Sequence, residues 1–356
     1  MAELSQPGSY GLRIVFMGTG PFAVPSLEAM LAAETRAKGH EVLALVTQPA
    51  RASRGKPAPP SPMRVVAESR RVPILDPESI NTPESQQMLR DLKPDLFIVA
   101  DYGQILSNAS LDVARLGGIN LHGSLLPKYR GAAPINWAIY KGDPTTGVTV
   151  IQMSSKVDAG ACLAQASLAI DPEENAVELE HRLSKLGAPL VVEIVDRLAV
   201  GTVQPLVQDP ALATPARRLR KTDGEVDWNR TAQEIKNQIR GLEPWPRTAT
   251  HWLRAAGEPL RVILTRVDVR DATVRESASG VSGATVGSGA AVGDRSSPGT
   301  VIDVAKDEFA IAAGSGSLVV RELQPAGKRA MPAGEFLRGY QVKVGEKFGP
   351  APTSEA

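Results

Sequence analysis

The stretch LRIVFMGTG, residues 12–20, determines how the first half of the chain folds. It is a short apolar run that ends in two glycines, a pattern typical of a buried strand that enters a tight turn. Residues 25–38 have a helical composition that Gly39 ends, and EVLALVT at 41–47 is a second apolar run. This order indicates parallel strands joined by a crossing helix.

The same alternation continues along the chain. Further strands are expected at 72–75, 96–100 and 118–121, and helices at 61–71 and 84–92. Because helices separate most of the strands, the sequence predicts an α/β fold with a doubly wound, mostly parallel, Rossmann-like sheet.

Two further elements are expected before residue 208. Residues 146–153 and 161–170 are strand-like and are joined by a polar loop, which indicates a hairpin. A long helical stretch follows at 175–200, and we expect a break in it near Gly187 and Pro189, because glycine and proline weaken helix interiors.

The sequence changes character near residue 208. After a polar and basic stretch, one helix is expected at 231–241, and several short strands with glycine turns predict a small C-terminal β-barrel of the OB type. The expected strands are 261–269, 299–305, 308–313 and 318–323. Residues 277–298 are rich in Gly and Ser and are predicted to be a flexible insert. The predicted organisation is a first domain at 1–207, a basic linker at 208–224, a second domain at 225–342 and a tail at 343–356.

Composition excludes few classes of protein but sets bounds. The chain has 356 residues, a net charge of +1 and 42% hydrophobic residues, enough for two domains with real cores. No apolar run approaches the roughly 20 residues of a membrane span, and the first residues do not resemble a signal peptide. With Cys162 as the single cysteine, no internal disulfide can form, and we expect a cytoplasmic protein. Cys162 itself lies in a predicted strand and is expected in the core.

The glycines after the first strand invite comparison with a dinucleotide-binding turn. Gly18, Gly20 and Ala23 fit the pattern G-x-G-x-x-A. That fingerprint also needs an acidic residue at the end of the second strand, where this chain has Thr47 and Gln48. We therefore predict a tight turn at the edge of the active cleft and no nicotinamide site.

One constellation in the chain could carry chemistry. Asn120 and His122 are two residues apart on a predicted strand, so their side chains share a face, and Asp158 lies in the polar loop SSKVDAGAC. An amide donor, a titratable ring and a carboxylate are the groups that acyl transfer needs. The alternative is an ordinary packed histidine. The four histidines lack zinc-ligand spacing, so no metal is required.

These residues lie within longer motifs. The segment NLHGSLLPKYRGAAP at 120–134, with VDAGA at 157–161, resembles the signature of the 10-formyltetrahydrofolate-dependent formyltransferases. Over nearly the whole chain, further segments resemble the branch of that family that formylates methionine on initiator tRNA: RIVFMGTGPFA, TQPARASRGKPAPPSPM, VADYGQIL, VDW, IRGLEPWP and LQPAGKRAM. The chain departs from the family at Gly20-Pro21, where a Pro-Asp order is expected, and at Asp101, where a small apolar residue is expected.

The resemblance implies roles for individual residues. It makes Asn120, His122 and Asp158 catalytic, with 10-formyltetrahydrofolate as formyl donor and initiator methionyl-tRNA as acceptor. It places tetrahydrofolate against Ser124, Leu125, Leu126, Pro127, Tyr102, Gly103 and Gln104. Candidate tRNA contacts are Arg54 and Lys56 in the proline-rich loop, Arg217 and Arg218 in the basic linker, and Lys328 in the second domain. Plain solvated charge is the alternative for the basic residues, and Trp245 is expected to pack inside the second domain.

Other functions compatible with the sequence are formylation of a small amine and an inactive RNA-binding relative. Hydrolysis of the formyl donor is possible as a side activity. We expect a monomer that has no membrane partner.

Overall fold

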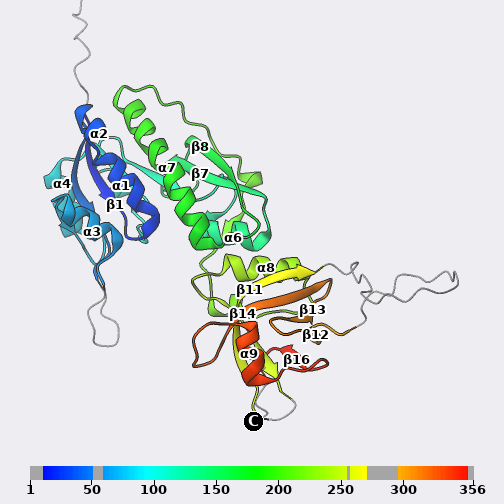
Figure 1. Ribbon diagram of the computed structural model, residues 1–356. Helices are drawn as coiled ribbons and strands as arrows, with labels where there is room; N and C mark the ends of the chain where they lie inside the picture. Colours follow the sequence, from blue (N-terminus) through cyan, green and yellow to red (C-terminus); the bar gives the residue numbers. More distant parts are fainter. Residues whose placement is uncertain (1–10, 51–58, 255–256, 271–295, 352–356) are drawn as a thin grey trace, which may run out of the picture. The chain divides into compact units, whose positions relative to one another are not determined.

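The computed structural model describes residues 11–50, 59–254, 257–270 and 296–351. The chain divides into two compact units, which are described separately (Figure 1). The first unit comprises Met1–Ala138, Pro144–Pro172 and Val177–Arg218, and the second comprises Ile139–Asp143, Glu173–Ala176 and Leu219–Ala356. One boundary between the units lies between Arg218 and Leu219, inside the segment 208–224 that we expected to be a linker.

The first unit is built on a seven-stranded sheet with the order β3-β2-β1-β4-β5-β7-β8. The strands are β1 (Arg13–Met17), β2 (Glu41–Val46), β3 (Ile74–Leu75), β4 (Leu96–Val99), β5 (Gly118–His122), β7 (Thr145–Gln152) and β8 (Cys162–Ala169). The first five strands in this order, from β3 at the edge through β2, β1 and β4 to β5, are parallel to one another. Strands β7 and β8 continue the sheet in antiparallel orientation. The mostly parallel, doubly wound sheet that the sequence predicts is confirmed.

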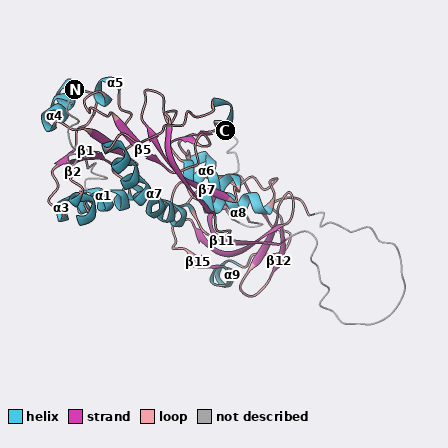
Figure 2. Ribbon diagram, turned by 90° about the horizontal axis from the view of Figure 1, so that it is seen from above, coloured by secondary structure: helices cyan, strands magenta, loops and turns pink. Residues whose placement is uncertain are grey.

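Continuous apolar runs explain why these strands lie at the centre. Ile14, Phe16, Phe97 and Ile98 are fully buried on β1 and β4. Strands of a parallel sheet are covered by helices on both faces, so both of their side-chain rows are apolar. Figure 2 shows this arrangement, with α4 (Pro83–Leu92) on one side of the sheet and α1 (Val24–Met30) on the other.

Two helices of this unit, α3 and α4, begin at side-chain caps. Ser61 and Thr82 each accept a backbone hydrogen bond at the start of α3 and α4, where a proline follows in the first turn. The remaining elements are η1 (Pro21–Ala23), α2 (Ala33–Ala37), α3 (Pro62–Ser69), α5 (Asn108–Leu111), α6 (Pro134–Lys141) and α7 (Ala176–Ala199). The expected single helix at 25–38 is wrong, because the chain leaves the helix at Ala32 and forms α1 and α2.

The expected break in the long helix is also wrong. Helix α7 continues through Gly187 and Pro189 without interruption. A side chain at Gly187 would stand 2.7 Å from a methyl carbon of Leu121 on β5, so the glycine lets the helix approach the sheet closely. Packing against the sheet therefore holds a helix that its local sequence weakens.

The second unit is a barrel-like antiparallel sheet with the order β12-β13-β14-β11-β10-β16. Its elements are α8 (Ala232–Gly241), β10 (Thr248–Leu253), β11 (Leu260–Arg270), β12 (Val301–Val304), β13 (Phe309–Ala312), β14 (Ser317–Pro325), β15 (Met331–Pro332), α9 (Ala333–Tyr340) and β16 (Lys347–Gly349). The end strands are linked, since the Val301 N–H donates to the Glu346 carbonyl over 2.8 Å and the Phe348 N–H donates to the Gly299 carbonyl over 2.7 Å. The predicted β-barrel is confirmed.

The core of the barrel is aromatic. Phe336 on α9 is fully buried and lies 5.9 Å from Trp252 and 6.3 Å from Phe309, measured between ring centroids. Sequence reasoning placed no element at β10, α9 or β16. It also expected Trp245 inside this domain, which is wrong: Trp245 is 54% exposed, and Trp252 occupies the core.

Two other expected segments have different outcomes. Most of the Gly/Ser-rich insert at 277–298 lies outside the described residues, as does the end of the tail. The basic linker is packed: η2 (Pro210–Leu212), β9 (Pro215–Ala216) and η3 (Lys221–Gly224) lie in it, and Ala216 and Leu219 are buried. Across the described parts of the chain, every helix is too short or too polar to span a bilayer.

Removal of the Phe336 ring should destabilise the second unit. Phe336→Ala is expected to lower the free energy of unfolding by about 3–5 kcal/mol, because a fully buried aromatic leaves a cavity. Urea unfolding followed by tryptophan fluorescence measures this change. Arg338→Ala, an exposed position on the same helix, is the matched control and should shift the unfolding free energy by less than about 0.5 kcal/mol. Equal effects of the two substitutions would contradict the assigned core.

Candidate active site

The carboxyl end of β5 presents an amide and an imidazole on one face. Asn120 pairs with Val99 of β4 and with Ile151 of β7, and His122 lies opposite Thr149 of β7. Because side chains alternate along a strand, Asn120 and His122 point the same way. His122 is only 5% exposed, so its ring is fixed by its surroundings.

Asp158 completes this group from the loop between β7 and β8. Its Oδ1 atom lies 3.4 Å from Asn120 Nδ2, which donates to it, and 3.6 Å from His122 Nδ1. Its Oδ2 atom accepts a 2.9 Å hydrogen bond from the Gly131 N–H. The structure therefore brings together the three residues that the sequence singled out, with one carboxylate oxygen facing both partners.

The backbone around His122 fixes its tautomer. His122 Nε2 lies 2.9 Å from the carbonyl oxygen of Tyr129. A carbonyl can only accept, so Nε2 carries a hydrogen, and Nδ1 is the atom that faces Asp158. In the neutral ring Nδ1 has a lone pair, and so does the nearby carboxylate oxygen.

Two residues of this site have an unusual backbone conformation: Tyr129, whose carbonyl contacts His122, and Asp158 itself. Tyr129 and Asp158 have φ angles of +63° and +50°. The left-handed region costs a residue other than glycine roughly 1–2 kcal/mol, so surrounding contacts must hold both residues there. The Tyr129 carbonyl and the Gly131 N–H are functional groups that sequence reasoning missed, because backbone groups leave no side-chain signal.

The predicted folate segment at 124–127 is a tightly bonded turn. Ser124 is fully buried, and its hydroxyl donates to the Lys128 carbonyl over 2.6 Å. Thr149 donates to the Ser124 carbonyl and accepts from the Leu126 N–H. Leu126 packs with Ile151 and Cys162 in a small core cluster, whereas Leu125 and Pro127 are partly exposed. The contact of this segment with folate stays a prediction.

Cys162 itself is buried, which confirms its predicted place in the core. Burial raises the pKa of its thiol, with the nearby Arg130 charge acting in the opposite direction. A thiol with a raised pKa is a poor nucleophile near neutral pH.

The second predicted folate loop uses its side chains for structure. The Tyr102 ring is buried, and its carbonyl accepts hydrogen bonds from Gln48 Nε2 and Thr19 Oγ1. Gln104 accepts from the Ile80 N–H over 2.9 Å. Gly103 is exposed and has a φ angle of +83°. Of these three residues, Gly103 is the most exposed.

The two departures from the family pattern are linked in space. The Asp101 carbonyl accepts from the N–H groups of Thr19 and Gly20, and its carboxylate occupies the space that a side chain at position 20 would fill. The residue keeps contact with solvent, but surrounding protein desolvates the carboxyl and raises its pKa to about 6. Burial and the charge of Asp101 raise the pKa of Glu180 to about 7, against a hydrogen bond from Phe22 that lowers it.

The candidate tRNA contacts lie in different places. Arg54 and Lys56 lie outside the described residues. In the first unit, the Arg217 guanidinium lies 4.9 Å from the ring centroid of Trp137, and Arg218 is exposed beside it. In the second unit, Lys328 is exposed after β14, and its carbonyl accepts from Gln324.

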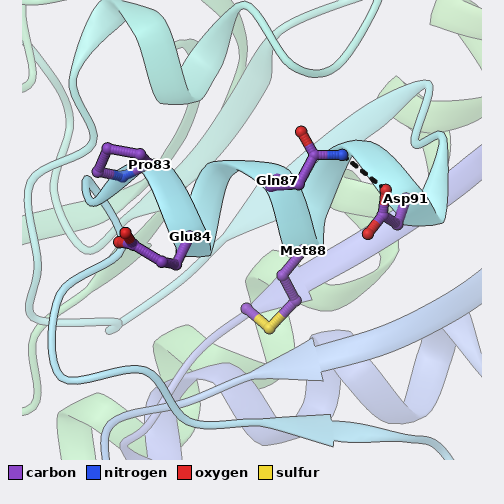
Figure 3. A pocket seen from close by; sticks show the side chains of 5 residues that line it. All are labelled: Pro83, Glu84, Gln87, Met88 and Asp91. Carbon is purple, nitrogen blue, oxygen red and sulfur yellow. Dashed lines mark hydrogen bonds between the residues drawn. The ribbon is translucent and has the colours of Figure 1, made fainter.

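A hollow elsewhere on the first unit is unrelated to this chemistry. It is lined by Pro83, Glu84, Gln87, Met88 and Asp91, all on one face of α4 (Figure 3). Gln87 and Asp91 are hydrogen bonded to each other. Among the described residues, no three His, Cys, Asp or Glu side chains are grouped as metal ligands.

Comparison with known proteins identifies related sequences. Residues 12–195 match the formyl transferase family, and residues 218–341 match the formyl transferase C-terminal domain. The methionyl-tRNA formyltransferase of Citrifermentans bemidjiense is 42% identical over 95% of this chain and 97% of its own length. Those of Geobacter sulfurreducens and Moorella thermoacetica are 38% and 40% identical, over 97% and 95% of this chain and 99% of each relative.

Solved structures share the fold at low sequence identity. A sugar 3N-formyltransferase, WlaRD, in the presence of dTDP and 5-N-formyl-THF, has a TM-score of 0.58 at 16% identity and covers 89% of this chain and 99% of its own. HypX from Aquifex aeolicus in complex with tetrahydrofolic acid has a TM-score of 0.56 at 16% identity, over 94% of this chain and 50% of its own.

The raised pKa of Glu180 predicts a pH-dependent stability. A carboxyl whose pKa is higher in the folded state stabilises the fold below its unfolded value of 4.5, and this contribution is lost as the pH rises through about 7. Glu180→Gln should therefore raise the melting temperature at about pH 8 and leave it unchanged near pH 4, relative to the wild-type chain. Glu193→Gln, at an exposed position on the same helix, is the control. Thermal unfolding at both pH values tests this, and a gain confined to low pH would contradict it.

Proposed function

The chain belongs to the methionyl-tRNA formyltransferase family, and we propose that it transfers the formyl group of 10-formyltetrahydrofolate to the α-amino group of methionine on initiator methionyl-tRNA. The product is N-formylmethionyl-tRNA, which serves in translation initiation. The observation that carries the chemical proposal is the convergence of the Asn120 amide and the His122 ring on Asp158 Oδ1.

The reaction makes and breaks one bond at the formyl carbon. The α-amino nitrogen attacks this carbon, and the bond from the carbon to N10 of the folate breaks. A proton leaves the amino nitrogen, and N10 gains one. While the carbon is tetrahedral, its oxygen carries negative charge that preorganised donors can stabilise.

Each catalytic side chain has a role that its position supports. Asn120 Nδ2 donates to the developing oxyanion, and His122 Nδ1 donates to it when the ring is protonated. Asp158 lies beside both, so it accepts the proton from the amino nitrogen and returns it toward N10. An α-amino group has a pKa near 8, so a useful fraction is neutral at physiological pH and needs no covalent intermediate.

We assign the folate ring to the turn at 124–127 and to the loop of Tyr102, Gly103 and Gln104. Leu125 and Pro127 are the partly exposed apolar side chains of the turn, and a flat heteroaromatic ring requires such a surface. In the loop, the backbone at Gly103 supplies polar groups. A cytoplasmic location, a monomeric state and the absence of a metal requirement remain predictions.

The barrel unit carries a surface suited to nucleic acid. Trp245 is exposed, and Arg247 follows two residues later and donates to Gln324 over 2.6 Å. Gln324 in turn donates to the carbonyl of Lys328. Arg247 is ion-paired with Glu243 over 3.2 Å, so Lys328 is the exposed cation of this group. An exposed aromatic ring near a cation is typical of nucleic-acid surfaces, where bases stack and phosphates pair with charge. In the first unit we assign tRNA contacts to Arg54, Lys56, Arg217 and Arg218.

The three catalytic residues should be required for turnover. Asn120→Ala and His122→Ala should each lower kcat by roughly 10²-fold or more, because each removes a donor to the transition state. Asp158→Asn keeps the size of the side chain but cannot take up the proton, and it should be similarly damaging. Binding of tRNA, measured by filter retention, should change little. A variant that keeps more than a tenth of wild-type kcat would remove its residue from the mechanism.

Steady-state kinetics with each substrate varied tests the acceptor. Wild-type chain, 10-formyltetrahydrofolate and charged initiator tRNA should yield formylmethionine on the tRNA. Arg54→Ala should raise KM for methionyl-tRNA and leave KM for the folate nearly unchanged, with a defect that grows with salt. Arg54→Lys should restore only part of the lost recognition of methionyl-tRNA, since an ammonium lacks the two-pronged guanidinium contact.

The control for this test is Arg36→Ala. Arg36 is exposed on α2, which precedes β2 and therefore lies at the amino-terminal edge of the sheet, opposite the site. Its kinetics should match the wild type. Formylation of a small amine in place of methionyl-tRNA would contradict the proposed acceptor, and an unchanged tRNA KM and kcat in Arg54→Ala would remove the loop from tRNA recognition.

A further inference from the structure

The segment 206–217, here called the strap, contacts the loop that carries Asp158 and the segment at 129–131 that contacts His122 on β5. We propose that the strap positions His122 and Asp158 from both sides, through the amide of Gln208 and the hydroxyl of Thr214. These are positioning residues, since Gln208 acts through the backbone at Asp158 and Gly160, and Thr214 acts through the backbone at Tyr129. The choice of assay, although not the geometry, rests on the proposed formyl transfer.

Gln208 holds the loop of Asp158. Its Oε1 atom accepts two hydrogen bonds from Arg130, at 3.1 Å from Nε and 2.7 Å from Nη2. Because Arg130 has donors only, this contact fixes which end of the amide faces it. The opposite end, Nε2, then donates to the carbonyls of Asp158 (2.9 Å) and Gly160 (2.7 Å). Gln208 is 7% exposed, and all four of these hydrogen bonds are made.

The Asp158 backbone needs such a hold. With a φ angle of +50°, Asp158 lies in the left-handed region, which costs energy even for aspartate, one of the residues that tolerate it best. Gln208 binds its carbonyl, and the Gly131 N–H binds its carboxylate, so the residue is held at both ends. Loss of the carbonyl contact lets the peptide rotate, and the carboxylate then moves away from His122.

Thr214 holds the other partner. Its Oγ1 atom accepts from the Tyr129 N–H over 2.9 Å, and its carbonyl accepts from the Arg130 N–H over 2.8 Å. These contacts bracket Tyr129 in its left-handed conformation, with a φ angle of +63°. The Tyr129 carbonyl is the acceptor that fixes the tautomer of His122. Thr214 is thus separated from the His122 ring by one residue.

The strap is tied to the first unit beyond these two residues. Leu206 and Cys162 exchange two backbone hydrogen bonds of 2.8 Å each. At the other end, Pro215–Ala216 (β9) pairs in parallel with Arg130–Gly131 (β6), and the Trp137 indole donates to the Arg217 carbonyl over 2.8 Å. A segment fastened at both ends can transmit position to the groups that its middle contacts.

Isosteric substitutions test the proposal in the full-length chain. Gln208→Met removes both amide donations and Thr214→Val removes the hydroxyl, each with little change in volume. Each should lower kcat for methionyl-tRNA formylation by about 10–100-fold, as loss of a supporting contact typically does, while KM for both substrates stays within about twofold. The pH dependence of kcat should also change, because both substitutions alter the distance between the His122 ring and the Asp158 carboxylate.

A double-mutant cycle separates positioning from general damage. Gln208→Met should cost less than about twofold when added to Asp158→Asn, because the group that it positions is already lost. Thr214→Ser keeps the hydroxyl and should retain most activity, whereas Gln208→Glu cannot donate and should stay impaired. Asp209→Ala is the matched control: it removes the neighbouring cap on the Ala211 N–H and should leave kcat unchanged.

The outcomes discriminate between the two hypotheses. A wild-type chain that does not formylate methionyl-tRNA contradicts the proposed function. An active wild type with an unimpaired Gln208→Met, or an equal loss from this substitution with and without Asp158→Asn, overturns the role of the strap. Two measurements show whether each variant is folded: its melting temperature, and its binding of folate followed by fluorescence. If Gln208→Met is unfolded, Thr214→Val with the Thr214→Ser rescue decides, and impairment of both in equal degree counts against the proposal.

Discussion

A single carboxylate oxygen, Asp158 Oδ1, organises the site, and most of the first unit can be understood as the means of holding it. Strand β5 supplies the two groups that face it, and the hairpin of β7 and β8 carries it. In the antiparallel register of β7 and β5, Gln152 at the end of β7 lies opposite Ile119, and the loop that follows returns to place Asp158 beside Asn120 and His122.

Sequence patterns predicted the elements that are uniformly apolar and those that depend only on neighbouring residues in the chain. The strands β1 and β4 are apolar runs that are almost wholly buried, and β2 is an apolar run that is buried over its second half, so their composition alone identified them. The two-residue spacing of Asn120 and His122 likewise implied a shared face. Asp158 came from a polar loop and from family resemblance, since nothing in its own neighbourhood indicates a left-handed residue that is held by distant contacts.

Elements that depend on tertiary contacts escaped prediction. Helix α9 is short, and its place is set by the burial of Phe336 against rings from other strands. Nothing in the sequence distinguishes Trp245 from Trp252. Trp245 is exposed because it lies in a turn outside the sheet, whereas Trp252 lies on β10 and belongs to the core. Gln208 looked like part of a polar connector. Only the fold places Arg130 behind it and two carbonyls in front of it.

Closure of the second unit has a consequence for how it meets other molecules. Backbone groups at the two ends of its sheet, near β12 and β16, are hydrogen bonded to each other through the N–H groups of Val301 and Phe348. A sheet with paired end strands offers little template for an incoming chain, so self-assembly through strand addition is disfavoured. Whatever approaches this unit meets protruding side chains such as Trp245 and Lys328. Its associations should therefore be tunable by single substitutions and by salt, and they should form and dissolve without any remodelling of the sheet.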